Sequence, residues 1–320
     1  MVTGGSGFIG SNLIDKLIEQ KKKIICIDNF DDFYSKNIKL NNMQASLKSP
    51  DYTFVEGDIR NQELLEKIFS ENKIDAVVHL AAKAGVRPSI SNPDIYFDVN
   101  VNGTLCLVHA MNKYQVKKLV FSSSSSVYGN NIKIPYSETD NVDFPISPYA
   151  ASKKSCELLI HTFHHLNKLD VINLRFFTVY GPRQRPDLAI SKFFKSIYNG
   201  RSIDVYGDGS TSRDYTYIDD IVQGICNSLT YLEHYENVYE TINLGNNHPV
   251  KLTELIDIIE QVTLKKFSIN YLPVQEGDVN HTFADIKKKK KLLSYNPTKT
   301  IKEGLLNFND WYEGQLKLSH

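Results

Sequence analysis

The sequence predicts an α/β protein built on a doubly wound parallel sheet. Two observations predict this class. A glycine-rich turn at residues 4–10 opens an amphipathic helix, and a short apolar strand that ends in an acid follows it. Apolar runs of strand length then alternate with segments of helical periodicity through the first half of the chain. That alternation is typical of βαβ units in a parallel sheet.

The composition excludes several classes of protein. At 320 residues the chain suffices for one large domain or two smaller ones. Its 37 basic side chains balance 37 acidic ones, which argues against nucleic acid or a membrane surface as partner. No apolar run approaches the ~20 residues that span a bilayer, and the N-terminus lacks signal-peptide features. The cysteines stand singly in apolar surroundings, so we expect reduced thiols, no metal site and a cytoplasmic location. They are Cys26, Cys106, Cys156 and Cys226.

The glycine-rich turn has the features of a dinucleotide-binding loop. Gly4, Gly7 and Gly10 allow the backbone to approach a pyrophosphate, which the following helix attracts with its N-terminus. The strand at 24–27 ends in Asp28, whose carboxylate accepts hydrogen bonds from the adenosine ribose and repels a 2′-phosphate. NAD is therefore favoured over NADP. Because only three residues precede Gly4, we expect a first strand that is either a stub or cut short upstream.

The remaining strands expected in the first half of the chain indicate where ligands bind. Further strands are expected at 53–59, 76–82 and 118–122, with helices at 61–70 and 94–114. Since ligands bind beyond the carboxyl ends of parallel strands, the candidate ligand-binding stretches are 82–89, 122–126 and 176–185. His79 lies inside an apolar run, and we expect a core histidine there rather than a ligand.

Tyr149 is the centre of the expected chemistry. Ser147 and Pro148 are typical of a helix start, and Tyr149 and Lys153 are four residues apart, so they share a helix face. A phenol normally keeps its proton to a pH of ~10, and we expect the neighbouring ammonium to lower the pKa of Tyr149 so that it acts as a base. A hydroxyl from the serine run 122–126 completes a Ser–Tyr–Lys arrangement that moves protons to and from an alcohol.

These motifs resemble the extended short-chain dehydrogenases/reductases of the nucleotide-sugar epimerase and dehydratase group, over the chain to about residue 312. The matching residues are Gly4-x-x-Gly7-x-x-Gly10, Asp28, Asp58-Ile59, Phe121 to Gly129, Tyr149-x-x-x-Lys153, Tyr206-Gly207-Asp208-Gly209, Arg213-Asp214-Tyr215 and Glu276-Gly277-Asp278. The resemblance implies a Rossmann domain for NAD at 1–177 plus about 217–247. It also implies a smaller, discontinuous α/β domain for a UDP-sugar at about 178–216 plus 248–320, and a homodimer.

The resemblance also implies individual site residues. The catalytic set is Tyr149, Lys153 and Ser124, the serine that lies three residues before Val127. The implied NAD contacts are Gly4, Gly7, Phe8, Ile9, Gly10, Asp28, Asn29, Asp58, Ile59, Leu80, Ala81, Ala82, Asn100, Ser122, Tyr149, Lys153 and Phe177. The implied substrate contacts are Arg87, Ser124, Ser125, Ser126, Thr178, Arg185, Val205, Tyr206, Arg213 and Asp278. Among these, Arg213 is assigned to the diphosphate and Asp278 to the uridine ribose.

Three stretches resemble the UDP-glucuronate 4-epimerases within the group, namely 27–34, 82–89 and 174–187. The UDP-glucose 4-epimerases usually carry Asn where this chain has Thr178, and the family often has Gln at Lys83. Arg87 and Arg185 lie on loops expected to face the pocket, and a guanidinium pairs bidentately with a carboxylate. We therefore expect NAD-dependent interconversion of UDP-glucuronate and UDP-galacturonate. The alternatives are a UDP-glucose or UDP-N-acetylglucosamine 4-epimerase, a UDP-glucuronate decarboxylase and a non-catalytic NAD sensor.

The run Lys287 to Lys291 has two interpretations. A nucleic-acid or targeting patch is one, and a solvated face of a short helix that ends before Pro297 is the other. Because the chain has no net charge, we expect the solvated face.

Overall fold

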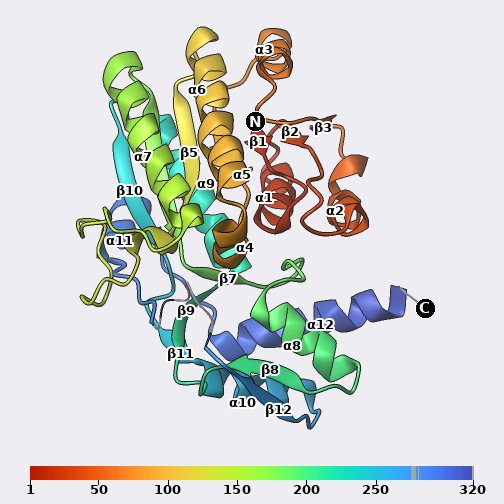
Figure 1. Ribbon diagram of the computed structural model, residues 1–320. Helices are drawn as coiled ribbons and strands as arrows, with labels where there is room; N and C mark the ends of the chain where they lie inside the picture. Colours follow the sequence, from red (N-terminus) through yellow and green to blue (C-terminus); the bar gives the residue numbers. More distant parts are fainter. Residues whose placement is uncertain (275–278, 280, 319–320) are drawn as a thin grey trace.

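A computed structural model describes residues 1–274, 279 and 281–318 of the chain. Its largest sheet consists of β1 (Val2–Thr3), β2 (Ile24–Asp28), β3 (Tyr52–Glu56), β4 (Val77–His79), β5 (Lys118–Ser124), β6 (Asp170–Phe176) and β10 (Tyr239–Leu244). Within the described residues these seven strands run in the order β10-β6-β5-β4-β1-β2-β3 (Figure 1), and all their pairings are parallel. The predicted doubly wound parallel sheet is confirmed.

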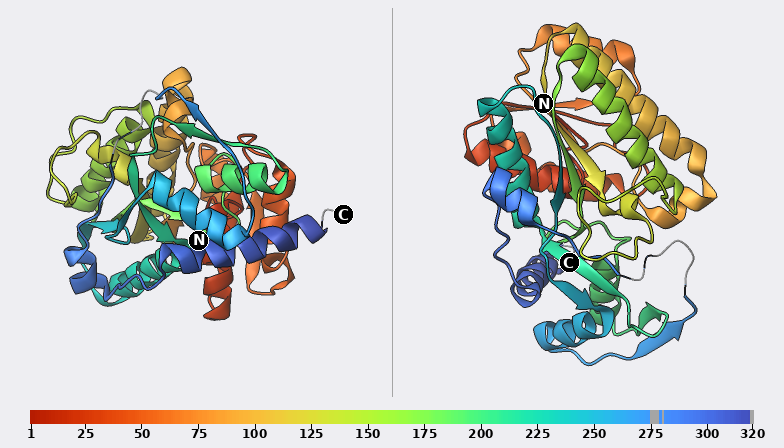
Figure 2. Two further views of the ribbon diagram at one scale, coloured as in Figure 1. Left: turned by 90° about the horizontal axis from the view of Figure 1, so that it is seen from below. Right: turned by 90° about the vertical axis from the view of Figure 1, so that its left-hand side faces the viewer.

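Helices cover both faces of this sheet, which the right-hand view of Figure 2 shows between its two helical layers. One layer contains α1 (Phe8–Glu19), α2 (Lys36–Met43) and α9 (Ile218–His234). The other contains α3 (Gln62–Glu71), α4 (Val86–Ser91), α5 (Pro93–Phe97), α6 (Gly103–Lys113) and α7 (Pro148–Asn167). Two short 3₁₀ turns are η1 (Ser46–Lys48) and η3 (Ser125–Tyr128). None of the helices in the described part of the chain is long and apolar enough to cross a bilayer.

The first strand is a stub that nevertheless lies at the centre of the sheet. Val2 pairs with Cys26 of β2 on one side and with Val78 of β4 on the other. His79 is buried beside this stub, with Nδ1 2.7 Å from Thr3 Oγ1 and Nε2 3.0 Å from Thr104 Oγ1. Burial lowers its pKa to about 3, so the imidazole is neutral. The expectation of a satisfied core histidine is confirmed.

The helix expected over 94–114 consists of α5, a π-helical turn η2 (Asp98–Asn102) and α6. The wider turn places Asn100 against Lys83, whose backbone N–H donates to Asn100 Oδ1 (2.8 Å) and whose carbonyl accepts from Asn100 Nδ2 (3.1 Å). Sequence periodicity does not distinguish this turn from α-helix, because one extra residue in a turn barely changes the apolar pattern.

The smaller part of the molecule lies in the lower half of Figure 1. It contains β7 (Thr178–Tyr180), β9 (Ser212–Tyr217) and β11 (Pro249–Lys251) in one sheet, and β8 (Ile203–Tyr206) and β12 (Ile269–Leu272) in another. Its helices are α8 (Ala189–Tyr198), α10 (Leu252–Thr263) and α12 (Ile301–Leu318). The chain leaves the large sheet at Phe176 and enters β7 at Thr178. The exact division into two domains stays a prediction.

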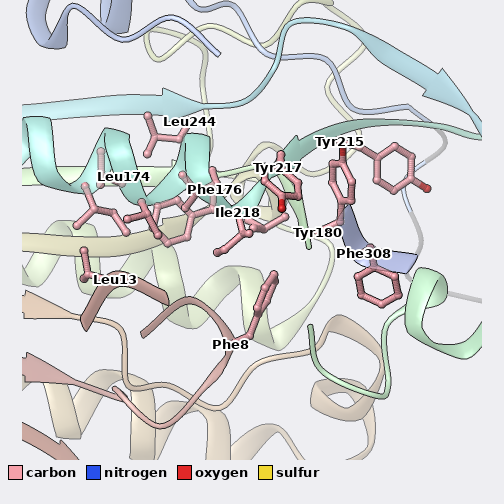
Figure 3. Close-up of a cluster of buried hydrophobic side chains, with 14 of the residues drawn as sticks. Phe8, Leu13, Leu174, Phe176, Tyr180, Tyr215, Tyr217, Ile218, Leu244 and Phe308 are labelled. Carbon is pink, nitrogen blue, oxygen red and sulfur yellow. The ribbon is translucent and has the colours of Figure 1, made fainter. Parts of the chain in front are cut away.

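One apolar core joins the two parts. Figure 3 shows Leu13 and Leu174 at the large sheet, Ile218 at the junction, and Tyr180 and Phe308 in the smaller part. All of these side chains are buried, so the smaller part packs through a shared core against the ends of the strands where ligands are expected. The four cysteines are free thiols, and all except the partly buried Cys106 are fully buried.

The lysine run forms helix α11 (Lys287–Leu293), and the predicted solvated face was wrong for one residue. Lys290 and Lys291 are exposed, whereas Lys289 is 0% exposed. Lys289 and Leu293 are four residues apart, so both lie on the helix face that packs inward. The helix end before Pro297 is confirmed.

Candidate active site

The carboxyl ends of the central strands border a cavity of about 470 Å³. Residues from all three expected ligand-binding stretches line it. The predicted site residues among them are Gly4, Gly7, Phe8, Ile9, Gly10, Asp28, Asn29, Asp58, Ile59, Leu80, Ala81, Ala82, Ser122, Ser124, Ser125, Ser126, Tyr149, Lys153, Phe177, Thr178 and Arg185. The fold therefore brings the expected nucleotide-binding and catalytic residues to one place.

The glycine turn at one end of the cavity has the shape that a dinucleotide requires. Gly4 has a φ of +71°, and a Cβ there would lie 2.7 Å from the backbone nitrogen of Ala81. A Cβ on Gly10 would lie 2.3 Å from the carbonyl oxygen of Gly4. Only glycine allows the turn, the strand and the helix to pack this closely. The N-terminus of α1 then faces the cavity, where its free N–H groups can bind an anionic pyrophosphate. The cradle fits NAD.

Gly10→Ala tests this cradle. Helix propensity alone favours Ala by about 1 kcal/mol, but the added methyl must displace Gly4, and such overpacking costs about 1–3 kcal/mol. We expect the variant to unfold at lower temperature and to retain less NAD after purification, measured by chromatography of the released nucleotide. Gly314→Ala is the matched control, because its Cβ would meet nothing within 4 Å. Equal NAD content in the Gly10 variant and in the wild type would contradict the prediction.

Two carboxylates predicted to meet the adenosine of a dinucleotide, Asp28 and Asp58, line the cavity. Asp28 Oδ2 accepts from the backbone N–H of Ser6 (3.0 Å) and Oδ1 from that of Phe30 (2.9 Å), so its orientation is fixed at the end of β2. Hydrogen bonds from Arg60 lower the pKa of Asp58 to about 2, and Asn29 donates to the same carboxylate at 2.9 Å. Both groups are placed to accept hydrogen bonds from a ribose or an adenine edge.

The predicted catalytic residues Ser124, Tyr149 and Lys153 line the same cavity. Ser147 Oγ accepts from the backbone N–H of Ala150 (3.2 Å) and caps α7 as expected. This cap starts the helix so that Tyr149 and Lys153 face the cavity, with Ser124 at the end of β5 beside them. Ser124 Oγ in turn accepts from the backbone N–H of Ser126 at 3.1 Å.

The expectation that Lys153 lowers the pKa of Tyr149 was wrong. Burial raises the pKa of Tyr149, and the groups that oppose this rise are the Ser124 hydroxyl and the positive charge of Arg185. Lys153 Nζ instead donates to the Ser122 carbonyl at 2.7 Å and lies 5.1 Å from the centre of the Phe121 ring. Burial lowers the pKa of this ammonium to about 8.

A second, smaller cavity of about 130 Å³ continues from the first. Ser125, Ser126 and Thr178 line both cavities, and Arg213 lines the second. Arg185 lies in the large cavity, where Nε and Nη2 bind Asp187 at 2.9 and 2.8 Å. The described residues thus surround the space beyond Tyr149 with hydroxyls and cationic groups.

Several predicted contacts do not line either cavity. Arg87 is exposed, and its guanidinium lies 5.2 Å from the centre of the Tyr206 ring. The prediction that Arg87 faces the pocket was therefore wrong for this structure. Val205 is buried in β8. Asn100 is buried, and its amide is occupied by Lys83 and by Ser152 Oγ (2.9 Å). Asp278, with the motif Glu276-Gly277-Asp278, lies outside the described residues.

The predicted site residues do not include Asp31, Lys39 and Lys83, which also line the large cavity. Lys83 Nζ lies 2.7 Å from Asp31 Oδ2, and Lys39 Nζ donates to the Asp31 carbonyl. The ion pair of Lys83 with Asp31 joins the loop after β4 to the loop after β2. Both residues lie in stretches that the sequence singled out, 82–89 and 27–34, but they are distant in the chain, so the sequence did not pair them.

The chain is similar to known proteins over nearly its whole length. Residues 1–308 match the family model described as GDP-mannose 4,6 dehydratase. A UDP-glucuronate 4-epimerase of Thermodesulfobacterium geofontis is 43% identical over 319 residues, which cover 99% of this chain and 97% of the relative.

Two solved structures are also similar over nearly the whole chain. The UDP-glucuronic acid 4-epimerase from Bacillus cereus, in complex with UDP-glucuronic acid and NAD, has a TM-score of 0.93 at 34% identity, covering 98% of each chain. The UDP-glucose 4-epimerase from Thermotoga maritima, with UDP-glucose, has a TM-score of 0.90 at 33% identity and the same coverage. The fold is common to uronate and neutral-sugar enzymes, so the substrate depends on side chains in the site.

Proposed function

We propose a reaction for this chain, which belongs to the GDP-mannose 4,6 dehydratase family of extended short-chain dehydrogenases/reductases. The chain is an NAD-dependent 4-epimerase that interconverts UDP-glucuronate and UDP-galacturonate through a transient 4-keto sugar. One observation carries this proposal: Ser124, Tyr149 and Lys153 share a cavity with the guanidinium of Arg185 and the hydroxyl of Thr178. The first three suit chemistry at an alcohol carbon, and the last two suit an acidic sugar.

The residues that would hold NAD are the glycine turn, Asp28 and Lys153. When bound, NAD accepts one hydride from the sugar and returns it, so no net oxidation occurs. Asp28 favours a ribose without a 2′-phosphate. Lys153, anchored on the Ser122 carbonyl, presents its remaining protons to the cofactor side of the cavity. The tight cradle around Gly10 supports retention of the cofactor between turnovers.

Tyr149 moves the proton. Its phenolate removes the proton of the sugar 4-hydroxyl, and Ser124 donates a hydrogen bond that stabilises the charge. The positive charge of Arg185 also favours this phenolate. After the 4-keto sugar has turned in the cavity, Tyr149 would return the proton to the 4-oxygen, so that the acid–base group ends in its starting state.

An epimerase for this substrate must also prevent loss of CO₂. A 4-keto group beside a C5 carboxylate makes a β-keto acid, which decarboxylates when the breaking bond aligns with the carbonyl π system. We propose that Arg185, Thr178, Ser125 and Ser126 hold the carboxylate out of that alignment. Arg185 binds Asp187 through Nε and Nη2, which fixes the orientation of its guanidinium. We propose that Nη1, which takes no part in these two bonds, donates to the sugar carboxylate.

The function is tested by offering UDP-glucuronate, UDP-glucose and UDP-N-acetylglucosamine separately and following each sugar by proton NMR. We expect UDP-galacturonate from UDP-glucuronate, without UDP-xylose. Turnover of the neutral sugars alone would overturn the proposal in favour of a UDP-glucose or UDP-N-acetylglucosamine 4-epimerase. Formation of UDP-xylose would assign a decarboxylase instead.

Three finer points belong to this proposal. Arg213 binds the substrate diphosphate, because it lines the second cavity with Ser126 and Thr178. The protein acts as a homodimer through α6 and α7, whose outer face includes Leu158, 58% exposed. It acts in the cytoplasm, where its free thiols stay reduced.

A further inference from the structure

Lys289 is a buried cation that the reaction itself does not use. Its side chain is 0% exposed. Nζ donates to the Gly245 carbonyl and lies 4.0 Å from the centre of the Tyr295 ring. The charge is costly in such a place unless it is paired, and burial lowers the pKa of Lys289 to about 7, while the carboxylates of Asp214 and Asp220 raise it.

Asp214 is the buried anion on the other side of Gly245. Its Oδ1 accepts from the backbone N–H of Asn246 at 2.6 Å, and its Oδ2 accepts from those of Asn247 and Ala284, each at 3.0 Å. A Cβ on Gly245 would lie 3.0 Å from Asp214 Oδ2. One carboxylate therefore ties β9 to the loop after β10 and to the segment before α11. Lys289 holds the same loop from within the core, because its Nζ donates to the carbonyl of Gly245, the residue before Asn246.

The tied segments carry one wall of the second cavity. Arg213 adjoins Asp214 on β9 and lines this cavity, as do Thr282 and Tyr136. Thr282 Oγ1 accepts from the Asp214 backbone N–H (3.0 Å), and Tyr136 N–H donates to the Phe283 carbonyl (2.7 Å). Hydrogen bonds thus connect this wall to Asp214 and, through the loop after β10, to Gly245.

We propose that Lys289 is a positioning residue for UDP-sugar binding. It fixes the loop 245–247, which Asp214 ties to Arg213 and to residues 281–284 at the second cavity. It does not touch the substrate. The inference rests on the proposed function, because it takes the second cavity as the site of the UDP diphosphate.

The test uses holoenzyme with Lys289→Met, which keeps the length of the side chain and removes its charge. We expect the variant to bind UDP about tenfold more weakly by calorimetry and to show a similar rise in KM for UDP-glucuronate. We expect kcat and the content of bound NAD to stay close to wild type, because the glycine turn and Tyr149 are not among the segments that Lys289 and Asp214 hold in place. Lys290→Met, on the exposed face of the same helix, is the matched control and changes UDP binding by less than about twofold.

A second variant covers a failure of the first to fold. Asp214→Asn keeps the size of the side chain but removes its charge and one of its two acceptor oxygens, and it too weakens UDP binding with NAD retained. Unchanged UDP binding in the Lys289 variant, or in the Asp214 variant where the first does not fold, would overturn the inference. A joint loss of UDP binding, kcat and NAD would overturn it as well, because it indicates general disruption of the core. If wild-type protein bound no UDP, the proposed function would fail instead, so the two failures are distinguishable.

Discussion

Tyr149→Phe is expected to lower kcat by ~10²–10⁴-fold, the range typical of a lost general acid–base group. The phenyl ring keeps the packing in the cavity, including the edge contact with Tyr96 at 6.3 Å between ring centres. Binding of NAD and of UDP-glucuronate is therefore retained. Rapid-quench or NMR assays of UDP-galacturonate formation measure the rate, and calorimetry measures the binding.

Tyr96→Phe is the matched control for this prediction. Its hydroxyl donates to the Ala84 carbonyl at 3.1 Å, next to Tyr149 but outside the proton path. We expect it to change kcat only a few-fold, in keeping with one lost neutral hydrogen bond of about 1 kcal/mol. A Tyr149 variant that kept a substantial share of wild-type kcat would show that another group removes the proton.

Glu157→Gln is expected to have the largest effect on stability. Glu157 is 3% exposed and accepts from Arg175 Nε and Nη2 at 2.9 and 2.8 Å, and from Ser123 Oγ at 2.6 Å. The substitution leaves the buried guanidinium of Arg175 without its counter-charge, which costs about 3–5 kcal/mol of the free energy of unfolding. Thermal and urea unfolding measure the loss.

An exposed ion pair provides the control. Glu19 lies 2.9 Å from Lys16 on the surface of α1, and Glu19→Gln changes the free energy of unfolding by less than about 1 kcal/mol. Glu157 also fixes α7 against β5, the two elements that carry Tyr149 and Ser124. A loss below about 1 kcal/mol in the Glu157 variant would mean that water or a neighbouring group replaces the lost charge.

Much of the large sheet was predictable because its signals are local. Each of three signals lies within a few consecutive residues: the glycine turn, the strand that ends at Asp28, and the capped helix that begins at Pro148. The same holds for Tyr149 and Lys153, since residues four apart on a helix always share a face. Strand bounds were less accurate, as at β4, where the apolar run 76–82 extends beyond the paired residues Val77–His79.

Electrostatic environment was not predictable in the same way. Lys153 was expected to lower the pKa of Tyr149, but the direction of its ammonium depends on the Ser122 carbonyl of another strand. The partner groups that oppose the rise of this pKa, Ser124 and Arg185, come from distant parts of the chain. Burial sets the direction of the pKa shift at Tyr149, and burial is a property of the packed structure.

By itself, the sequence of this protein determined the doubly wound sheet, the dinucleotide cradle and the pair Tyr149 and Lys153, because periodicity and turn chemistry act over a few residues. Only the tertiary structure decided which charges are buried and which groups they meet. The sequence does not distinguish the five consecutive lysines 287–291. In the structure, α11 packs on Gly245 and Tyr295, so Lys289 is buried while Lys290 stays in solvent. The pairing of Asp31 with Lys83 likewise arises because the sheet brings the ends of β2 and β4 to one cavity.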